Sequence, residues 1–279
     1  MQFIASQFAT LPALTPWLLA VALLISSLGF IRVVYFVSIG YAFSIVAMVA
    51  VTAAVYRGRL TLPAALQLLL LAVWGVRLGA YLVSRERQTA YKRQLEGNQS
   101  YDRRVPLLKR TPIWISVALL YVAMLAPALF AAEGAGAALQ VGRFAAQGAG
   151  LIVMAGGVVI EGVADSQKNA AKRACAECFT SVGLYKWVRC PNYLGEILVW
   201  TGSLIAAIPF LTSPLRIIVA LIGWVCIVLI MMGSTKRLER TQDARYGEQS
   251  AYREYVRTVP VLFPWVPVYS LKGVKVYLE

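Results

Sequence analysis

A polar segment lies directly before an apolar stretch in the second half of the chain. Pro191 marks a place where a helix can begin, and such a helix leaves its first backbone N–H groups free to bind an anion. Asn192, Glu196 and Trp200 recur every four residues, so they lie on one helix face and carry an amide, a carboxylate and an indole into a bilayer. The spacing predicts a polar binding site where the chain enters the membrane. Its side chains are those of Arg189, Asn192, Tyr193 and Glu196.

A second polar stripe precedes this segment and has helical spacing. It consists of Glu161, Asp165, Lys168, Asn169 and Lys172. Its carboxylates can accept hydrogen bonds from ribose or adenine, while Lys172 and Arg173 can bind a phosphate. A solvated helix face with i,i+4 ion pairs explains the same spacing, which favours neither interpretation. No phosphate-binding glycine motif follows a strand, so a nucleotide would need a membrane site of another kind.

Arg77 is a charged residue deep within an apolar stretch. Placing an arginine there costs about 2.5–3.5 kcal/mol on insertion scales. Trp74, Leu78 and Tyr81 share its helix face, so we expect the guanidinium to point inward to a carboxylate, a phosphate or water. The alternative is that Arg77 extends to the cytoplasmic boundary of the membrane.

The elements that must position these residues are transmembrane helices. The chain is 59% hydrophobic with a mean hydropathy of +0.67, which excludes an ordinary soluble domain. The fold class is therefore an all-α, polytopic membrane protein with seven helices. The predicted spans are residues 14–34, 36–56, 62–84, 112–132, 144–163, 192–212 and 214–233. We expect no cleaved signal peptide, because no basic residue precedes the first span.

Basic residues predict the orientation of these spans. With the N-terminus outside and the C-terminus inside, the basic segments 85–110, 164–190 and 234–279 all lie in the cytoplasm. The net charge of +14 therefore faces anionic lipid, and no nucleic-acid module is present. We expect membrane lipid as a partner, no nucleic acid and no obligatory protein partner. The membrane is the cytoplasmic membrane in a bacterium or the endoplasmic reticulum in a eukaryote.

The side chains available for chemistry are restricted. The chain has no histidine, which excludes Ser-His, Cys-His and His-metal mechanisms. Cys175 and Cys178 form a CxxC with Cys190 nearby, and a redox or zinc site there is conceivable. A second ligand pair is missing and the cytoplasm is reducing, so we expect free thiols and no metal.

The chain is predicted to be one membrane domain, 1–279, with two functional halves. Residues 1–110 form an apolar substrate-cavity half, in which Glu86 is the first acidic residue. Residues 111–279 form the cofactor half with its loops and tail. Within the tail, residues 246–260 have helical spacing and end at a proline, which predicts a cytoplasmic helix followed by an extended or interfacial segment.

Three motifs together resemble the membrane steroid 5-alpha-reductase family, which is related to delta-14 sterol reductases and isoprenylcysteine carboxyl methyltransferases. They are Asp165-Ser-Gln-Lys168, Gly183-Leu-Tyr-Lys-Trp-Val-Arg-Cys-Pro-Asn-Tyr-Leu-Gly-Glu196 and the tail Tyr246-Gly…Tyr252…Tyr255…Val259-Pro260. The similarity is specific over residues 160–265 and weak over 1–70. It implies that Asp165, Asn192 and Glu196 hold NADPH, with Arg189 close by, and that Arg77, Arg85 and Arg87 reach the cofactor phosphates. The full predicted cofactor site is Arg77, Arg85, Arg87, Asp165, Lys168, Lys172, Arg173, Arg189, Asn192, Tyr193, Glu196 and Trp200.

The sequence departs from the family pattern at three places. Cys190 replaces the histidine of the usual Arg-His-Pro, so any role of that histidine is absent. Trp74 stands where the steroid reductases have a substrate-holding tyrosine, and no acid corresponds to their glutamate. Tyr41, at a similar depth on the second span, is the predicted substitute that donates to the substrate carbonyl. Tyr41 and Trp74 are therefore the predicted catalytic residues.

The resemblance implies NADPH-dependent reduction of an enone in a membrane-soluble substrate, a 3-oxo-delta-4 steroid being the expected one. The partner is then a hydrophobic steroid or sterol-like small molecule. The alternative is an S-adenosylmethionine-dependent methyltransferase of the isoprenylcysteine type, which the tail fits almost as well. A transporter would explain the spans and Arg77 but not the polar loop.

Overall fold

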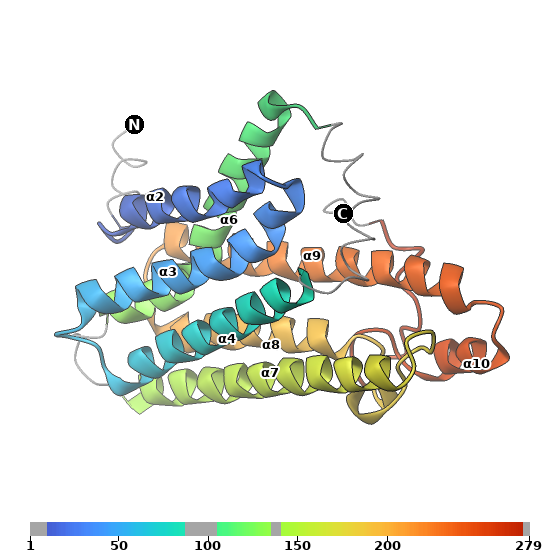
Figure 1. The fold of residues 1–279 in the computed structure, drawn as a ribbon. Helices are drawn as coiled ribbons and strands as arrows, with labels where there is room; N and C mark the ends of the chain where they lie inside the picture. The colour runs from blue at the N-terminus through green and yellow to red at the C-terminus, as the bar shows by residue number, and fades with distance from the viewer. Residues whose placement is uncertain (1–9, 87–104, 135–140, 276–279) are drawn as a thin grey trace. The chain divides into compact units, whose positions relative to one another are not determined.

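The computed structural model describes residues 10–86, 105–134 and 141–275, which form helices and loops without strands (Figure 1). This confirms the all-α fold class. Six of the helices are long and apolar enough to cross a membrane, so the chain is an integral, multi-pass membrane protein. They are α3 (Ile39–Tyr56), α4 (Leu62–Glu86), α6 (Leu107–Glu133), α7 (Val141–Ala174), α8 (Pro191–Ala207, continued by η5, Ile208–Phe210) and α9 (Pro214–Tyr246).

The span expected over residues 14–34 is not a single long helix. Its helix α2 covers only Thr15–Ser26, about 18 Å, and is followed by the short 3₁₀ helices η1 (Ser27–Phe30) and η2 (Val33–Val37). The hydroxyl of Ser27 donates to the carbonyl of Leu24 at 2.6 Å. Gly29 lies so close to Phe36 that an added Cβ would overlap its ring. The helix therefore breaks well short of the roughly 30 Å of a hydrocarbon core.

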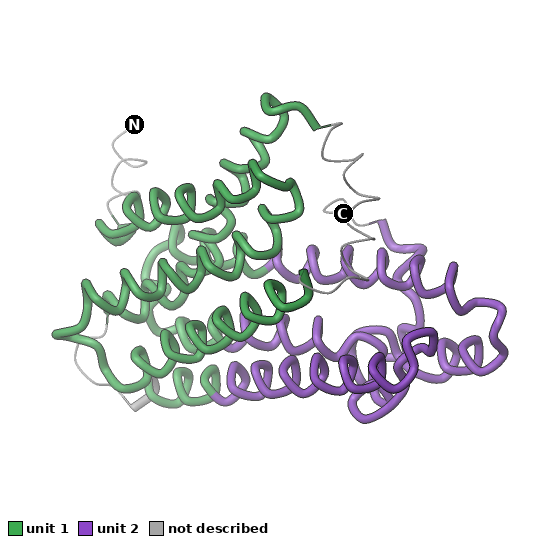
Figure 2. The backbone as a smooth tube through the Cα atoms, in the orientation of Figure 1, with its two compact units in different colours: residues 1–151, 203–224 green, residues 152–202, 225–279 purple. Residues whose placement is uncertain are grey.

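Two compact units divide the described chain (Figure 2). The first contains residues 1–151 and 203–224, and the second contains residues 152–202 and 225–279. Each border falls inside a helix, namely α7, α8 or α9, so these helices contribute to both units. The single membrane domain with halves 1–110 and 111–279 stays a prediction.

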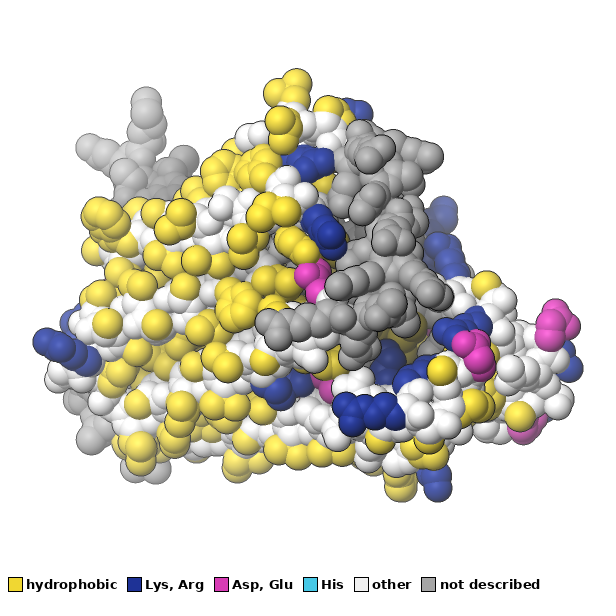
Figure 3. Space-filling model, viewed as in Figure 1, with side chains coloured by type: hydrophobic (Ala, Val, Ile, Leu, Met, Phe, Trp, Pro, Cys, Tyr) yellow, Lys and Arg dark blue, Asp and Glu magenta, His cyan; other side chains and the backbone are white. Residues whose placement is uncertain are grey.

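Helices α2, α3, α4 and α6 pack against one another in the first unit. Apolar side chains cover its visible face over α2, α3 and α4 (Figure 3). Such a surface suits contact with hydrocarbon rather than water.

The second unit is built on a close crossing of α7 and α8, which lie side by side in Figure 1. Helix α8 begins at Pro191, as predicted from the preference of proline for the first turn. Helix α7 has 34 residues and α9 has 33, lengths of about 50 Å that extend beyond a bilayer. The stripe of residues 161–172 therefore lies on one continuous helix, as its spacing predicted.

The tail also follows the prediction. Helix α10 covers Ser250–Thr258 and ends two residues before Pro260, after which residues 260–275 contain no helix. Backbone N–H groups of Arg189 and Cys190 donate to the carbonyls of Pro260 and Val261, at 2.9 and 3.0 Å. The tail is thereby attached to the segment that leads into α8.

Two adjacent glycines of α7 give opposite expected results when replaced by alanine. A Cβ on Gly157 would lie 2.6 Å from the carbonyl oxygen of Gly195 and 2.7 Å from the backbone nitrogen of Val199. Because backbone cannot move aside cheaply, we expect Gly157→Ala to destabilise the protein by about 1–3 kcal/mol. Gly156→Ala meets nothing within 4 Å and should be neutral or slightly stabilising. Thermal melting of both detergent-purified variants tests this, and equal melting temperatures would contradict the close crossing.

Candidate functional site

Buried carboxylates gather at the crossing of α7 and α8 in the second unit. Glu161, Asp165 and Glu196 are only 3%, 7% and 7% exposed. Glu161 touches the crossing itself, because its Cβ lies 2.7 Å from the position of a Cβ on Gly195. The missing side chain of Gly195 thus allows Glu161 of α7 to lie against the start of α8. Deeply buried ionisable groups cluster at functional sites, so this crossing is the candidate site.

Arg189 lies at the start of this site and is 2% exposed. Its Nη2 donates to Oε1 of Glu239 at 2.9 Å and to the carbonyl of Tyr269, and its Nε donates to the carbonyl of Val259 at 3.3 Å. Its Nη1 is buried and makes no hydrogen bond. Most of the guanidinium therefore holds the tail in place, while one N–H group remains available to an acceptor.

The other predicted residues of α8 differ in exposure. Asn192 and Tyr193 are half-buried near the helix start, and Trp200 is 2% exposed one turn after Glu196. The structure therefore brings Asp165, Arg189 and the polar face of α8 into one unit. Their role in binding a cofactor remains a prediction.

The basic residues of the α7 stripe have separate surroundings. Lys168 is half-buried, and its charge acts on Cys190 together with that of Arg189. Lys172 donates from Nζ to the hydroxyl of Tyr246 at 2.7 Å and to the carbonyl of Ala176 at 3.3 Å. Lys168 thus belongs to the site at the start of α8, whereas Lys172 stabilises the loop after α7. Arg173 is exposed.

The CxxC differs from the sequence-based expectation. Cys175 and Cys178 form a disulfide bond, where free thiols were predicted. The two residues directly follow the end of α7, and a turn brings the two Cα atoms to 5.4 Å, within the usual range for a disulfide. Cys190 remains a free, buried thiol, and burial raises its pKa to about 12. Within the described part of the chain, no three acidic, cysteine or histidine side chains are grouped to hold a metal.

The two predicted catalytic residues are neighbours in the first unit. The rings of Tyr41 on α3 and Trp74 on α4 have centroids 5.3 Å apart in an edge-to-face arrangement. Tyr41 also stacks on Tyr121 of α6 at 5.2 Å. All three rings are nearly inaccessible to solvent, at 7%, 0% and 3% exposed. The cluster fixes the Tyr41 ring by packing on two sides.

The predicted phosphate-binding arginines of α4 also lie in the first unit. Arg77 is half-buried one turn after Trp74, and Arg85 is half-buried near the helix end, 6.0 Å from the centroid of the Tyr81 ring. Arg87 lies outside the described residues. The roles of these arginines stay predictions.

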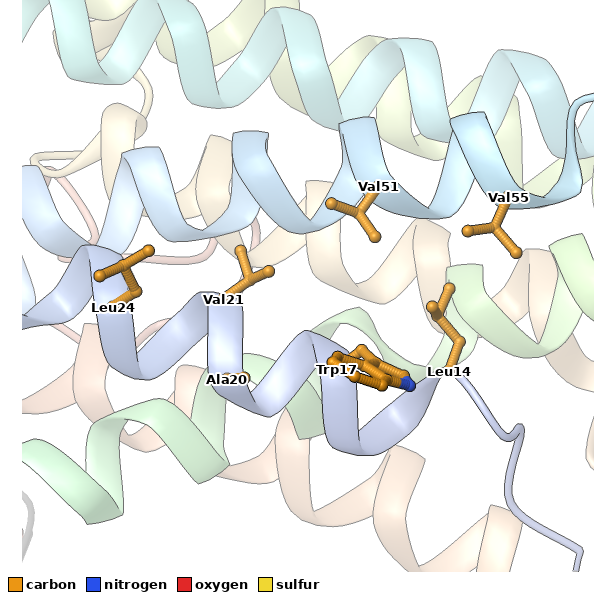
Figure 4. A pocket seen from close by; sticks show the side chains of 7 residues that line it. All are labelled: Leu14, Trp17, Ala20, Val21, Leu24, Val51 and Val55. Atoms are coloured by element: carbon orange, nitrogen blue, oxygen red, sulfur yellow. The ribbon is translucent and has the colours of Figure 1, made fainter.

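An apolar groove of about 500 Å³ opens between α2 and α3 (Figure 4). Trp17, Val21 and Leu24 line it from α2, and Val51 and Val55 line it from α3. Neither Tyr41 nor Trp74 is among its lining residues. The groove can accept a hydrocarbon, and the indole N–H of Trp17 is the single side-chain hydrogen-bond donor among the described residues that line it.

Glu239 is the important residue that the sequence analysis did not identify. It is 2% exposed, pairs with Arg189 and accepts from the backbone N–H of Leu271 at 2.8 Å. In the sequence it stands in the charged run Thr235-Lys-Arg-Leu-Glu-Arg240, which has the composition of a solvated helix end. Its burial and its contacts with Arg189, 50 residues before it, and Leu271, 32 residues after it, distinguish it.

Comparison with known protein families gives a match over most of the chain. A family model described as a protein of unknown function, DUF1295, matches residues 31–259. No curated protein and no solved structure shows significant similarity to the chain. The matched region contains every residue of the candidate site, including Glu239.

Proposed function

We propose that this chain, which belongs to the DUF1295 family, a steroid 5-alpha-reductase-like group, is an NADPH-dependent reductase. It reduces the carbon–carbon double bond of an enone. The substrate is a membrane-soluble molecule, and a 3-oxo-delta-4 steroid fits the family resemblance. The observation behind the proposal is that the second unit combines three buried carboxylates of α7 and α8 with Arg189, whose buried Nη1 makes no hydrogen bond. Carboxylate acceptors and a guanidinium donor suit the ribose hydroxyls and the phosphates of a dinucleotide.

Each residue has a proposed role in holding the cofactor. Asp165 and Glu196 accept hydrogen bonds from ribose hydroxyl or adenine amino groups, and charged acceptors make such bonds stronger. Nη1 of Arg189 and the ammonium of Lys168 donate to phosphate oxygens. Bound NADPH supplies the hydride for reduction of the double bond. The proposed task of these residues is therefore to bind the cofactor and to orient it.

Tyr41 has the proposed role at the substrate. Its hydroxyl donates to the substrate carbonyl and stabilises the enolate that forms when hydride adds to the beta carbon. A proton from solvent then adds to the alpha carbon, so NADPH and one proton together supply the two added hydrogen atoms. Trp74 and Tyr121 hold the Tyr41 ring, so the donor is preorganised. We retain the proposed orientation in which residues 164–190 and the tail lie in the cytoplasm, where NADPH is available.

Identification of the bound cofactor tests the function directly. We expect NADPH to copurify with the detergent-extracted protein and to be consumed when a 3-oxo-delta-4 steroid is added. Mass spectrometry should find the steroid product heavier by two hydrogen atoms. The control is the Tyr41→Phe variant, which should still bind NADPH but reduce the steroid far more slowly. Copurified S-adenosylmethionine, or methyl transfer to a prenylated cysteine, would instead establish the methyltransferase alternative.

A further inference from the structure

The tail after α10 exposes large apolar side chains that a soluble protein would bury. Trp265 is 88% exposed, and Phe263, Val266, Val268 and Tyr269 are each 37–44% exposed. Close to the start of α8, Trp187 is 64% exposed. Contiguous exposed apolar residues of this kind mark an interaction surface.

This surface is held in a fixed conformation. The N–H of Val261 donates to the carbonyl of Val268 at 2.9 Å and closes residues 261–268 into a loop. Arg189 donates to the carbonyl of Tyr269, and Glu239 accepts from the N–H of Leu271. The exposed side chains are therefore presented by a clamped backbone and not by a loose chain end.

Trp265 adopts a backbone conformation that is unfavourable for its type. Its φ is +64°, and it is the single described non-glycine residue with a positive φ. A bulky side chain in this region is strained, and such strain persists where the surroundings impose it. Here the residue with this conformation carries the largest side chain of the loop, which is 88% exposed.

The depth of the loop follows from its attachment. Val261 accepts from the N–H of Cys190, and the next residue, Pro191, begins the membrane-spanning helix α8. The loop and Trp187 are thus located where a helix enters the bilayer. Tryptophan and tyrosine prefer this level, since their rings are apolar with one polar group.

Positive charge accompanies the aromatic residues. Lys275 and Lys186 are exposed, and Lys272 is 43% exposed although it pairs with Asp243. These cations lie in the same unit as the loop and complement anionic headgroups. A surface that faces only water would not expose so many apolar side chains. An acidic protein partner would match the positive charge, but it would not explain why the surface lies beside Pro191, where a helix enters the membrane.

We propose that residues 261–269, together with Trp187, form a membrane-interface anchor that inserts its aromatic side chains among the anionic headgroups of the bilayer crossed by α7, α8 and α9. The anchor fixes the tail against the membrane surface, next to the site at the start of α8. The inference does not depend on the reaction that the site performs.

Fluorescence quenching of Trp265 tests the anchor. The full-length protein and its Trp265→Phe variant are reconstituted in vesicles of phosphatidylcholine and phosphatidylglycerol, and the difference between their emission spectra isolates Trp265. We expect this difference emission to be quenched by lipids brominated near the headgroup, less by lipids brominated near the chain end, and little by iodide. Trp74→Phe is the matched control, because the fully buried Trp74 should respond to no quencher.

Two outcomes would overturn the proposal. Strong iodide quenching without an effect of brominated lipid would place Trp265 in water. Protection from both quenchers would place it in a protein contact, such as a second copy of the chain. The variant Trp265→Gly separates anchoring from folding. Because glycine accepts a positive φ, its melting temperature in detergent should equal or exceed that of the parent, and a fall would mean that Trp265 supports the fold instead.

Discussion

The Glu196→Gln variant is expected to fold like the parent protein and to lose most of its affinity for NADPH. Glutamine has the same size as glutamate, so the packing of this 7% exposed side chain is preserved. The charge is removed, and a hydrogen bond to a charged group contributes about 1.5–3 kcal/mol. Cofactor affinity should therefore fall by about tenfold to a hundredfold. Energy transfer from tryptophan to bound NADPH measures the dissociation constant, and turnover of the steroid should fall with it.

The matched control for this variant is Glu248→Gln. Glu248 is an exposed glutamate in the same unit, between α9 and α10. Its replacement should change neither the affinity for NADPH nor the melting temperature. If Glu196→Gln binds NADPH as tightly as the parent does, Glu196 has only a structural role and the proposed cofactor site is misplaced.

The Arg189→Met variant is expected to have the largest effect on stability. It leaves the Glu239 carboxylate buried at 2% exposure without its cation, and it removes donors to the carbonyls of Val259 and Tyr269. Breaking a buried ion pair in this way costs about 3–5 kcal/mol. The melting temperature of the cofactor-free protein in detergent should fall by on the order of 10 °C.

Two further variants show whether buried charge is the cause. Adding Glu239→Leu to Arg189→Met removes the orphaned carboxylate and should restore part of the lost stability. Arg245→Met breaks the exposed pair with Glu177, whose side chains are 47% and 83% exposed, and should leave the melting temperature nearly unchanged. Equal losses for Arg189→Met and Arg245→Met would contradict the clamping role of Arg189.

Local pattern predicted the elements around the site well. The ring of Pro191 fixes its φ near the helical value, and the first turn of a helix does not use the N–H that proline lacks. Pro191 therefore identified the start of α8 without any tertiary information. The four-residue spacing from Glu161 to Lys172 similarly identified one face of a long α7. These features depend on residues within a few turns of each other, which is the range that a sequence reveals.

Features set by distant contacts were not predictable in the same way. The early end of α2 is an exception, because its causes are local. The Ser27 hydroxyl and the contact of Gly29 with Phe36 end the helix, although hydropathy over residues 14–34 is high. Arg189 has the residue type of a phosphate ligand, while its partners lie 50 to 80 residues further along the chain. Tyr41 and Trp74 were chosen on separate grounds, and their contact at 5.3 Å becomes visible only when α3 and α4 are packed.

The Arg189 clamp also determines the order in which the second unit can mature during synthesis. Tyr269, whose carbonyl Arg189 binds, is translated 80 residues after the arginine. At roughly 5–20 residues per second, the ribosome needs about 4–16 s to reach it. During that interval Arg189 waits at the start of α8 without its final partners, and the unit closes only when nearly the whole chain has been made. A premature stop before residue 239 would therefore leave a membrane-inserted protein with an uncompensated arginine, a defect that quality-control proteases could recognise.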